Sequence, residues 1–352
     1  MNEWTIAMQA RKWMKKNESF LYSWHAYVGS ELGLFDEFKE PASIEEVAFR
    51  AGYPEDLLES WVQVGVELKH LKEKDNKFRT SQKRCSALMS DYGSPGVAAL
   101  LKEMMELHLP TLLAYPNIMR SQERSSFDHD EFGGIVAETS ALLEHFAIRK
   151  IKRKVREQKI ETIVDLGCGH GGYLRKLADH FPDIKMIGVD INEKVIESAR
   201  LQSKDYPNIS FEVGDFEEWE PNEGKVDMIL LHNIFHYIHP EERSRLLEKI
   251  NENLKEDGVV SVITPLSGTE HGKAFSSAFN SFFVAHSNLY ALPKQSDLDT
   301  IFAKGDFDIF DLDPIIKEGS WFTFWLSPKA DEKTDVNQEE EREAPVQSVS
   351  SN

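Results

Sequence analysis

The second half of the chain alternates short apolar runs with helical stretches, and this rhythm constrains the fold more than any other feature. Strands that alternate with helices form right-handed crossover units, which build a parallel sheet with helices on both faces. The sequence therefore predicts an α/β fold for this half. Its five predicted buried strands are Glu161–Leu166, Lys185–Asp190, Ile209–Val213, Val226–Leu231 and Val259–Thr264.

The end of this region departs from the rhythm. Two more strands are predicted at Phe307–Leu312 and Ser320–Leu326, and the connection between them is too short for a crossover helix. They must pair antiparallel, as a hairpin on the sheet edge. Upstream, Pro240–Leu254 predicts an amphipathic helix, and Asp257-Gly258 predicts a turn into the fifth strand.

Three parts follow from these patterns, and the length of 352 residues suits two domains. Residues 1–145 show mainly helical patterns, and residues 146–328 carry the strand and helix alternation. Residues 329–352 have no large apolar residue beyond three valines, which predicts a disordered tail. The tail is acidic, with seven acids against Lys333 and Arg342 in residues 331–352.

The composition disfavours several classes of function. The net charge is −19, from 60 acidic and 41 basic residues, so neither nucleic acid nor an anionic membrane is an expected partner. Two cysteines, Cys85 and Cys168, predict neither a disulfide framework nor a zinc cluster, and no metal site is expected. No apolar run approaches the ~20 residues of a membrane helix. The N-terminus lacks the pattern of a signal peptide, so the expected location is cytoplasmic.

A glycine-rich turn, V-D-L-G-C-G-H-G-G, follows the first predicted strand and precedes a helix. Gly167, Gly169 and Gly172 satisfy the pattern G-x-G-x-x-G. Such a turn lets a ligand approach the backbone near a helix N-terminus. Nicotinamide dinucleotides and S-adenosylmethionine both bind at this kind of turn, so the pattern alone does not choose between them.

Residues at the strand ends favour S-adenosylmethionine. Asp165, just before the first glycine, would repel a pyrophosphate but suits the ammonium of an amino acid. Asp190 ends the second strand, where a carboxylate accepts ribose hydroxyls of either cofactor. Asp215 and Phe216 follow the third strand and offer an acceptor for an adenine amino group and a ring for its face. The terminal hairpin is foreign to most dinucleotide folds.

The motifs D-L-G-C-G-H-G, G-V-D-I, G-D-F and K-E-D-G-V-V-S-V-I resemble those of class I S-adenosylmethionine-dependent methyltransferases. The resemblance covers about residues 150–328 and implies a Rossmann-like, mostly parallel seven-stranded sheet with a C-terminal antiparallel hairpin. It also implies S-adenosylmethionine as the cofactor. The residues that would hold it are Asp165, Gly167, Cys168, Gly169, Asp190, Ile191, Asp215, Phe216 and His232.

Residues 20–90 resemble the N-terminal winged-helix dimerisation domain of the two-domain small-molecule O-methyltransferase family. The resemblance is carried by H-A-Y-V-G-S-E-L-G-L-F-D-E-F, A-S-I-E-E-V-A-F-R-A-G-Y-P-E-D-L-L-E-S-W and L-K-E-K-D-N-K-F-R-T-S. It implies a homodimer in which this domain roofs the substrate pocket. Winged helices also bind DNA, but acids such as Glu45, Glu55 and Asp56 dominate the helix-turn-helix here, which argues against that role.

The resemblance further implies a catalytic base. V-A-H-S-N is similar to the family segment "lmLAHNpGGkeRtekEf", which assigns His286 the role of general base toward an acceptor hydroxyl. An imidazole with a pKa near ~6.5 suits that role. The "GG-RER" part of that segment is replaced by L-Y-A-L-P-K-Q, so the pocket differs from that of plant phenylpropanoid enzymes. Candidate substrate-binding residues are Met104, His108, Phe132, Asn233 and His236, the last expected to be mainly structural.

The sequence therefore predicts methyl transfer from S-adenosylmethionine to a small molecule, with a hydroxyl as the favoured acceptor. Three alternatives stay open at this point. The first is methylation of carbon or nitrogen, which does not always need a base. The second is a winged-helix regulator whose Rossmann-like domain senses a ligand. The third is an NAD-dependent oxidoreductase.

Overall fold

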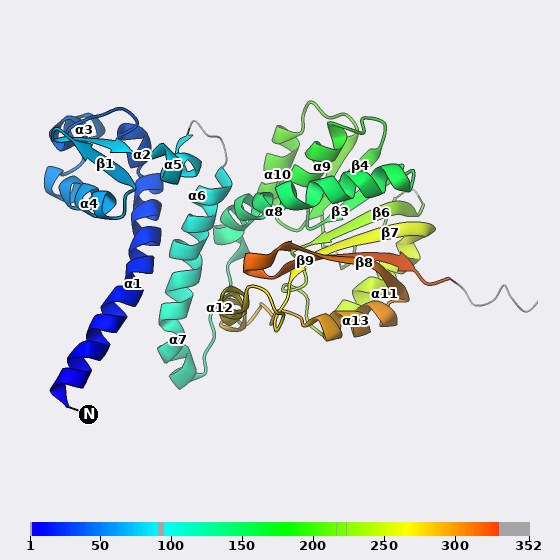
Figure 1. Cartoon of the computed structure of the whole chain (residues 1–352). Coiled ribbons are helices and arrows are strands. Elements are labelled where there is room, and N and C mark those ends of the chain that lie inside the picture. Colours follow the sequence, from blue (N-terminus) through cyan, green and yellow to red (C-terminus); the bar gives the residue numbers. More distant parts are fainter. Residues whose placement is uncertain (1, 91–94, 216, 223, 331–352) are drawn as a thin grey trace, which may run out of the picture.

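The computed structural model describes residues 2–90, 95–215, 217–222 and 224–330. A helical N-terminal part lies on one side of the molecule and a helix-covered sheet on the other (Figure 1). Within the described ranges, no helix is long and apolar enough to cross a membrane. Phe216 lies outside these ranges, as does the predicted acidic tail from residue 331 onward.

A seven-stranded sheet forms the centre of the C-terminal part, in the order β5-β4-β3-β6-β7-β9-β8. Strands β3 to β7 pair in parallel, whereas β9 runs antiparallel to both β7 and β8. The predicted fold class, a mostly parallel sheet with a terminal antiparallel hairpin, is confirmed. The strands are β3 (Thr162–Leu166), β4 (Lys185–Asp190), β5 (Ile209–Val213), β6 (Val226–His232), β7 (Leu254–Pro265), β8 (Phe307–Ile316) and β9 (Trp321–Pro328).

Helices cover both faces of this sheet (Figure 1). Successive side chains of a strand point to opposite faces, so Ile163 of β3 packs with Ile151 and Leu174, whereas Val164 packs with Leu247 and Phe302. Every residue of β6 is buried, as expected for a strand covered on both sides. The covering helices are α8 (His129–Glu157), α9 (Gly172–Ala178) and α10 (Glu193–Gln202) on one face, and α11 (Arg243–Asn253) and α13 (Gln295–Lys304) on the other.

Three predicted boundaries are wrong by three residues or more, and the first is the end of β8, which runs to Ile316 rather than Leu312. Strand β7 begins at Leu254 rather than Val259, and Asp257-Gly258 lies inside the strand instead of forming a turn before it. Leu254 pairs with Val226, and a register shift in the ladder absorbs the residues that follow. Helix α11 begins at Arg243 rather than Pro240, because residues 240–242 form a turn first.

The N-terminal part is built from helices and one small hairpin. A capping box between Ser43 and Glu46 begins the first of two consecutive short helices. The two strands that follow pair antiparallel, which is the element order of a winged helix. The elements are α1 (Glu3–Glu31), α2 (Leu34–Glu37), α3 (Ile44–Ala51), α4 (Glu55–Glu67), β1 (Leu71–Lys74), β2 (Lys77–Thr80) and α5 (Gln82–Cys85).

A second group of helices connects the N-terminal part to the sheet. Its last member, α8, runs without a break through the predicted domain boundary at residue 145 and ends beside β3. One long helix therefore contacts both the connecting helices and the sheet. The earlier members are α6 (Pro95–Lys102), a π-helical segment (Glu103–His108) and α7 (Leu109–Ser121).

Two histidines are buried in the core of the N-terminal part. His25 Nε2 donates to the carbonyl oxygen of Trp61 at 3.1 Å, so in the neutral ring Nδ1 is the acceptor. That Nδ1 lies 3.0 Å from His70 Nδ1, which must be the donor. Burial, and secondly His70, lowers the pKa of His25 from 6.5 to about 4. Protonation of His25 would set two N–H groups against each other in this core.

Acid is expected to destabilise the core around these two histidines. Unfolded His25 takes up a proton near pH 6.5 and the folded residue only near pH 4, so the free energy of unfolding is expected to fall as pH decreases across that window. Urea unfolding between pH 7.5 and 4 measures the effect. His25→Gln cannot titrate and is expected to show a shallower decline with pH. Parallel pH profiles for the variant and the wild type would contradict the prediction.

Candidate functional site

The glycine-rich turn joins β3 to α9 and adopts a conformation that its glycines permit. Gly167 and Gly169 have φ of +76° and +53°, values that residues with a side chain rarely adopt. A Cβ atom at Gly167 would lie 2.6 Å from Ile234 Cγ2, so the turn is also crowded there. The backbone N–H of Gly169 donates to Asp190 Oδ2 at 3.0 Å, which ties the turn to the end of β4.

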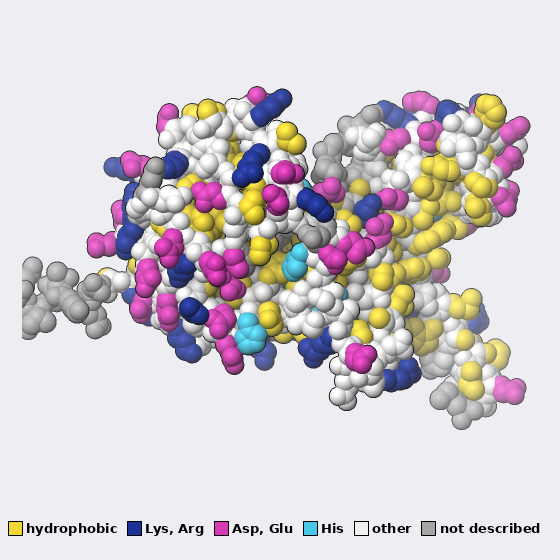
Figure 2. Space-filling view, turned by 180° about the vertical axis from the view of Figure 1, so that it is seen from behind, with side chains coloured by type: hydrophobic (Ala, Val, Ile, Leu, Met, Phe, Trp, Pro, Cys, Tyr) yellow, Lys and Arg dark blue, Asp and Glu magenta, His cyan; other side chains and the backbone are white. Residues whose placement is uncertain are grey.

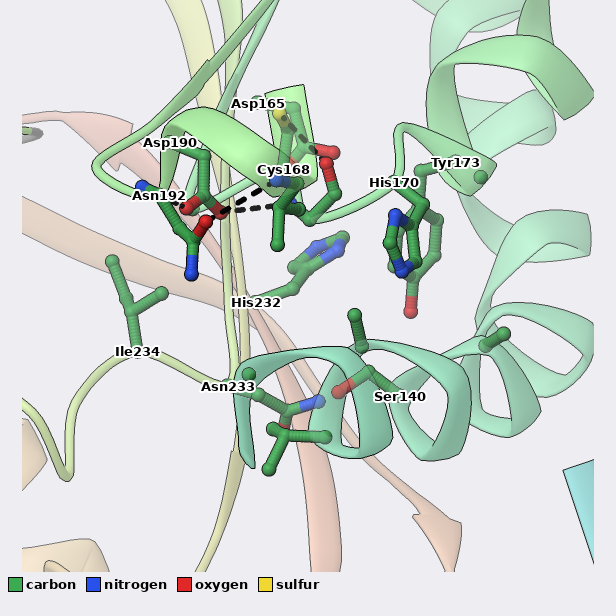
Figure 3. Close-up of a pocket in the computed structure, with 18 of the residues that line it drawn as sticks. Ser140, Asp165, Cys168, His170, Tyr173, Asp190, Asn192, His232, Asn233 and Ile234 are labelled. Carbon is green, nitrogen blue, oxygen red and sulfur yellow. Dashed lines mark hydrogen bonds between the residues drawn. The ribbon is translucent and has the colours of Figure 1, made fainter. Parts of the chain in front are cut away.

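A cavity of about 1350 Å³ opens between this turn, the carboxyl ends of the parallel strands and α8. Sites for single small molecules usually measure about 300–1,000 Å³, so there is room for a cofactor and part of a second molecule. Figure 3 shows Asp165, Cys168 and His170 of the turn region around this space, with Ser140 on the facing helix. The predicted cofactor residues that line the cavity are Asp165, Gly167, Cys168, Gly169, Asp190, Ile191, Asp215 and His232.

Asp165 is the most unusual group in the cavity wall. It is 1% exposed, and its Oδ2 has no hydrogen-bond partner among the described residues. Burial, with further contributions from Glu144 and Asp190, raises its pKa well above the ordinary value. A buried carboxyl group without a partner costs free energy, so this position favours a ligand that brings a donor or a positive charge.

Three more buried polar atoms of the cavity wall lack partners among the described residues: Tyr173 OH, His170 Nδ1 and His232 Nδ1. His232 is held by a hydrogen bond between its Nε2 and Ser261 Oγ, 3.0 Å apart, and its ring meets that of Tyr173 edge-on at 4.5 Å. Burial lowers the pKa of His232 to about 3, so the ring is neutral. The wall therefore offers several polar groups to a ligand.

The residues expected beside ribose and adenine lie at the ends of β4 and β5. Asp190 Oδ2 accepts from Gly169, and Oδ1 accepts from the N–H of Asn192 at 3.0 Å. Burial raises the pKa of Asp190. Ile191 is exposed beside it, and Asp215 is exposed after β5. These side chains border one end of the cavity, while the predicted adenine contact Phe216 lies outside the described residues.

The predicted acceptor-side residues lie elsewhere, apart from Asn233. Asn233 lines the cavity and its Oδ1 accepts from Trp321 Nε1 at 3.0 Å, which joins it to the terminal hairpin. None of the other four, nor His286, lines the cavity. His108, Phe132 and His236 lie in or against an aromatic layer made with α12 (Lys273–Val284). Met104 is half-buried in the π-helical segment.

His286 is buried in this layer. Its Nδ1 donates to the carbonyl oxygen of Phe282 at 2.9 Å, so in the neutral ring Nε2 carries the free lone pair. The ring packs against Phe127 and Phe282. Burial lowers its pKa. Phe127 also lines the cavity, so its ring contacts both His286 and that space.

His236 and His108 are packed in a similar way. His236 is buried between Tyr237 and Phe283, with ring centroids 4.3 and 4.4 Å away, and burial lowers its pKa to about 3. His108 Nε2 lies 3.2 Å from Glu103 Oε1, and its ring packs on Phe282 at 4.4 Å. The sequence could not show which histidines face the cavity and which face the aromatic layer.

Several cavity residues were missed at the sequence level. Helix α8 contributes Ser140 and Glu144, the segment before it contributes Asp128, and the strand ends contribute Asn192 and Tyr237. The helical pattern of α8 shows an apolar face but does not tell which element that face meets. Among the described residues, no group of three or more His, Cys, Asp and Glu side chains could hold a metal ion.

Comparison with known proteins gives this cavity a family context. A family model described as "Methyltransferase domain" matches residues 163–258, which run from β3 into β7 and include the glycine turn and the ends of β4 and β6. Residues 163–258 form a methyltransferase domain. The resemblance predicted from the glycine turn and the strand ends is confirmed.

Curated relatives match about a third of the chain rather than the whole of it. Trans-aconitate 2-methyltransferase of Deinococcus radiodurans is 31% identical over 119 residues, 33% of this chain and 43% of the relative. Carboxy-S-adenosyl-L-methionine synthase of Helicobacter pylori strain P12 is 29% identical over 121 residues, 34% of this chain and 49% of the relative. The chain thus spans less than half the length of each of these two proteins.

Solved structures share the fold over nearly the whole chain. Human N-acetylserotonin methyltransferase, in complex with SAM, has a TM-score of 0.72 and 17% identity and covers 92% of this chain and 98% of its own. A methyltransferase of calicheamicin biosynthesis, bound to SAH, has a TM-score of 0.69 and 18% identity and covers 93% and 99%. Mitomycin 7-O-methyltransferase has a TM-score of 0.72 and 17% identity and covers 92% and 99%. SAM, S-adenosylmethionine, is the cofactor that the sequence predicted.

Proposed function

We propose that this chain binds S-adenosylmethionine in the cavity and transfers its methyl group to a small-molecule acceptor. The observation that carries the proposal is Asp165, a buried carboxyl group with an unpartnered oxygen in the wall of a cavity large enough for cofactor and acceptor. A sulfonium cofactor with an ammonium group suits that oxygen better than a pyrophosphate does. The methyltransferase domain and the contents of the similar structures support the same cofactor.

The chain's own residues fit the parts of this cofactor. Asp165 would accept from the ammonium, and Asp190 from the ribose hydroxyls. Gly167, Cys168 and Gly169 would let the cofactor lie close to the turn. Further along, Asp215 would contact adenine, while His232 would border the methionine part. The bound sulfonium would supply a reactive methyl group, and the protein's task is then to align the acceptor and exclude water.

Proton removal is the remaining task when the acceptor is a hydroxyl. His286 would perform it, because its neutral ring has Nε2 free to take a proton while Nδ1 donates to Phe282. The acceptor would reach His286 past Phe127, whose ring contacts it. Met104, His108 and Phe132 would contact the acceptor there. Asn233 would contact it from the cavity side, and His236 would support the loop. Mitomycin 7-O-methyltransferase and trans-aconitate 2-methyltransferase are among the similar proteins, and their names support a small organic acceptor.

A screen of small molecules with methyl-labelled S-adenosylmethionine, read by mass spectrometry, tests this function. We expect a labelled product from at least one acceptor, and calorimetry is expected to show binding of S-adenosylmethionine but not of NAD(H). For a hydroxyl acceptor, His286→Ala should reduce turnover about 100-fold or more, the scale of general-base catalysis. Asn280→Ala, on α12, whose side-chain oxygen accepts a hydrogen bond from Leu292 N–H, serves as the control variant. Normal turnover of His286→Ala would remove His286 as the base.

We also propose that two copies associate through the N-terminal part. Helix α1 extends away from the rest of the molecule in Figure 1, and large apolar side chains on it are exposed. Figure 2 shows hydrophobic side chains along this arm on the face that it views. Exposed apolar surface of this extent favours a protein partner. The winged-helix resemblance supports a second copy of this chain as that partner.

A further inference from the structure

Glu144 of α8 lies against the glycine turn and is not part of the motif that predicted the cofactor site. Its carboxylate is buried and lines the cavity. A Cβ atom at Gly172 would overlap the Glu144 carboxylate oxygens, so the absence of a side chain at Gly172 is what admits them. The third glycine of G-x-G-x-x-G therefore makes room in this chain for an acid from a distant helix.

A second carboxyl group lies near Glu144. Asp165 is buried and lines the same cavity, and its Oδ2 has no hydrogen-bond partner among the described residues. After burial, the charge of Glu144 contributes to its raised pKa. The OH of Tyr173 also lacks a partner among the described residues. Burial, and then the charges of both acids, raise the pKa of Tyr173. Two buried carboxyl groups that face one space disfavour each other's ionised form unless a cation enters between them.

Lys176 gives Glu144 one partner already. Its Nζ forms an ion pair with Glu144 Oε2. Lys176 lies on α9, one helical turn after Gly172. The lysine side chain is 31% exposed, so water screens part of its charge. Neither Glu144 Oε1 nor Asp165 Oδ2 has a hydrogen-bond partner among the described residues. The ion pair therefore accounts for one of the two Glu144 oxygens.

We propose that Glu144 is a second acceptor, beside Asp165, for the ammonium of the amino-acid end of S-adenosylmethionine. The inference rests on the proposed function, since it names a further residue of that same cofactor site. It makes α8, which also contacts the connecting helices, part of the cofactor site. The bound cofactor would then contact both the sheet and a helix that runs back toward the N-terminal part.

Binding of two nucleosides separates this role from a packing role. S-adenosylhomocysteine has the ammonium, whereas 5′-methylthioadenosine has the same adenosine and sulfur without the amino-acid part. For Glu144→Gln, calorimetry is expected to show about 10-fold weaker binding of S-adenosylhomocysteine, since Gln keeps an acceptor oxygen but loses the negative charge that strengthens its hydrogen bond to the ammonium. Binding of methylthioadenosine should stay within about twofold of wild type.

A matched control keeps the test specific. Glu138 is also on α8 and lines the same cavity but is exposed, and Glu138→Gln should bind both nucleosides like the wild type. Equal weakening of both nucleosides by Glu144→Gln would overturn the proposal, because it would mean that α8 packing is disturbed. Unchanged binding of both would also overturn it. A wild-type protein that binds neither nucleoside would instead overturn the proposed function itself.

Discussion

Asp165→Asn is expected to weaken the binding of S-adenosylmethionine at least about 100-fold. Asn has nearly the same size, so the cavity wall should keep its shape, but it loses the negative charge. Truncating one partner of a buried, hydrogen-bonded charge pair costs about 2–5 kcal/mol, and 100-fold corresponds to about 2.7 kcal/mol. Calorimetric titration measures the change. Asp179→Asn, at an exposed acid that lines the same cavity, is the control and should leave the affinity within about twofold.

Proton release gives a second measure of the same prediction. The pKa of Asp165 is raised well above its ordinary value in the free protein by burial and then by Glu144 and Asp190. A bound ammonium favours the ionised form and lowers that pKa. Binding should therefore release protons below the raised pKa, so affinity rises with pH in that range. Titrations in buffers of different ionisation enthalpy detect this release, which Asp165→Asn should lose. Equal affinity and equal proton release in variant and wild type would contradict the assignment.

The sheet was predictable because its strands carry their own signal. A strand buried on both faces, such as Val226–His232, contains an unbroken apolar run, here Met228–Leu231, and the helices between such runs fix the crossover topology. The start of β7 was not predictable. Lys255 to Gly258 have the composition of a turn, and only the pairing of Leu254 with Val226 extends the strand through them.

The cavity wall around the glycine turn was predictable for a related reason. Parallel strands bring their carboxyl ends to one edge, so Asp165, Asp190 and His232 had to lie near one another. The side chains from α8 were not predictable, because no local pattern tells that Glu144 meets Gly172. The same limit applies to His286. Its sequence neighbours do not show that its ring packs behind Phe127 rather than on the cavity wall.

The apolar stripe of α1 carries the second large expected effect. Ile6, Trp13 and Phe20 are exposed and spaced by seven residues, and Met14 and Leu21 repeat that spacing. Seven residues make nearly two helical turns, so these side chains lie along one side of the helix. Such a stripe can pack against the same stripe of a second copy, as a two-fold interface requires.

Trp13→Asp is therefore expected to convert a dimer into monomers at micromolar concentration. Trp13 is 62% exposed in the single chain. Tryptophans buried at the centre of interfaces often contribute at least about 2 kcal/mol each, so the dissociation constant of the dimer should rise at least about 30-fold. Sedimentation or light scattering gives the mass, and circular dichroism checks that the helices are intact. Lys15→Asp also places an acid on α1, about 200° around the helix from Trp13, and should leave the dimer unchanged. A Trp13→Asp variant with the mass of a dimer, or a wild type with the mass of one chain, would exclude α1 as the interface.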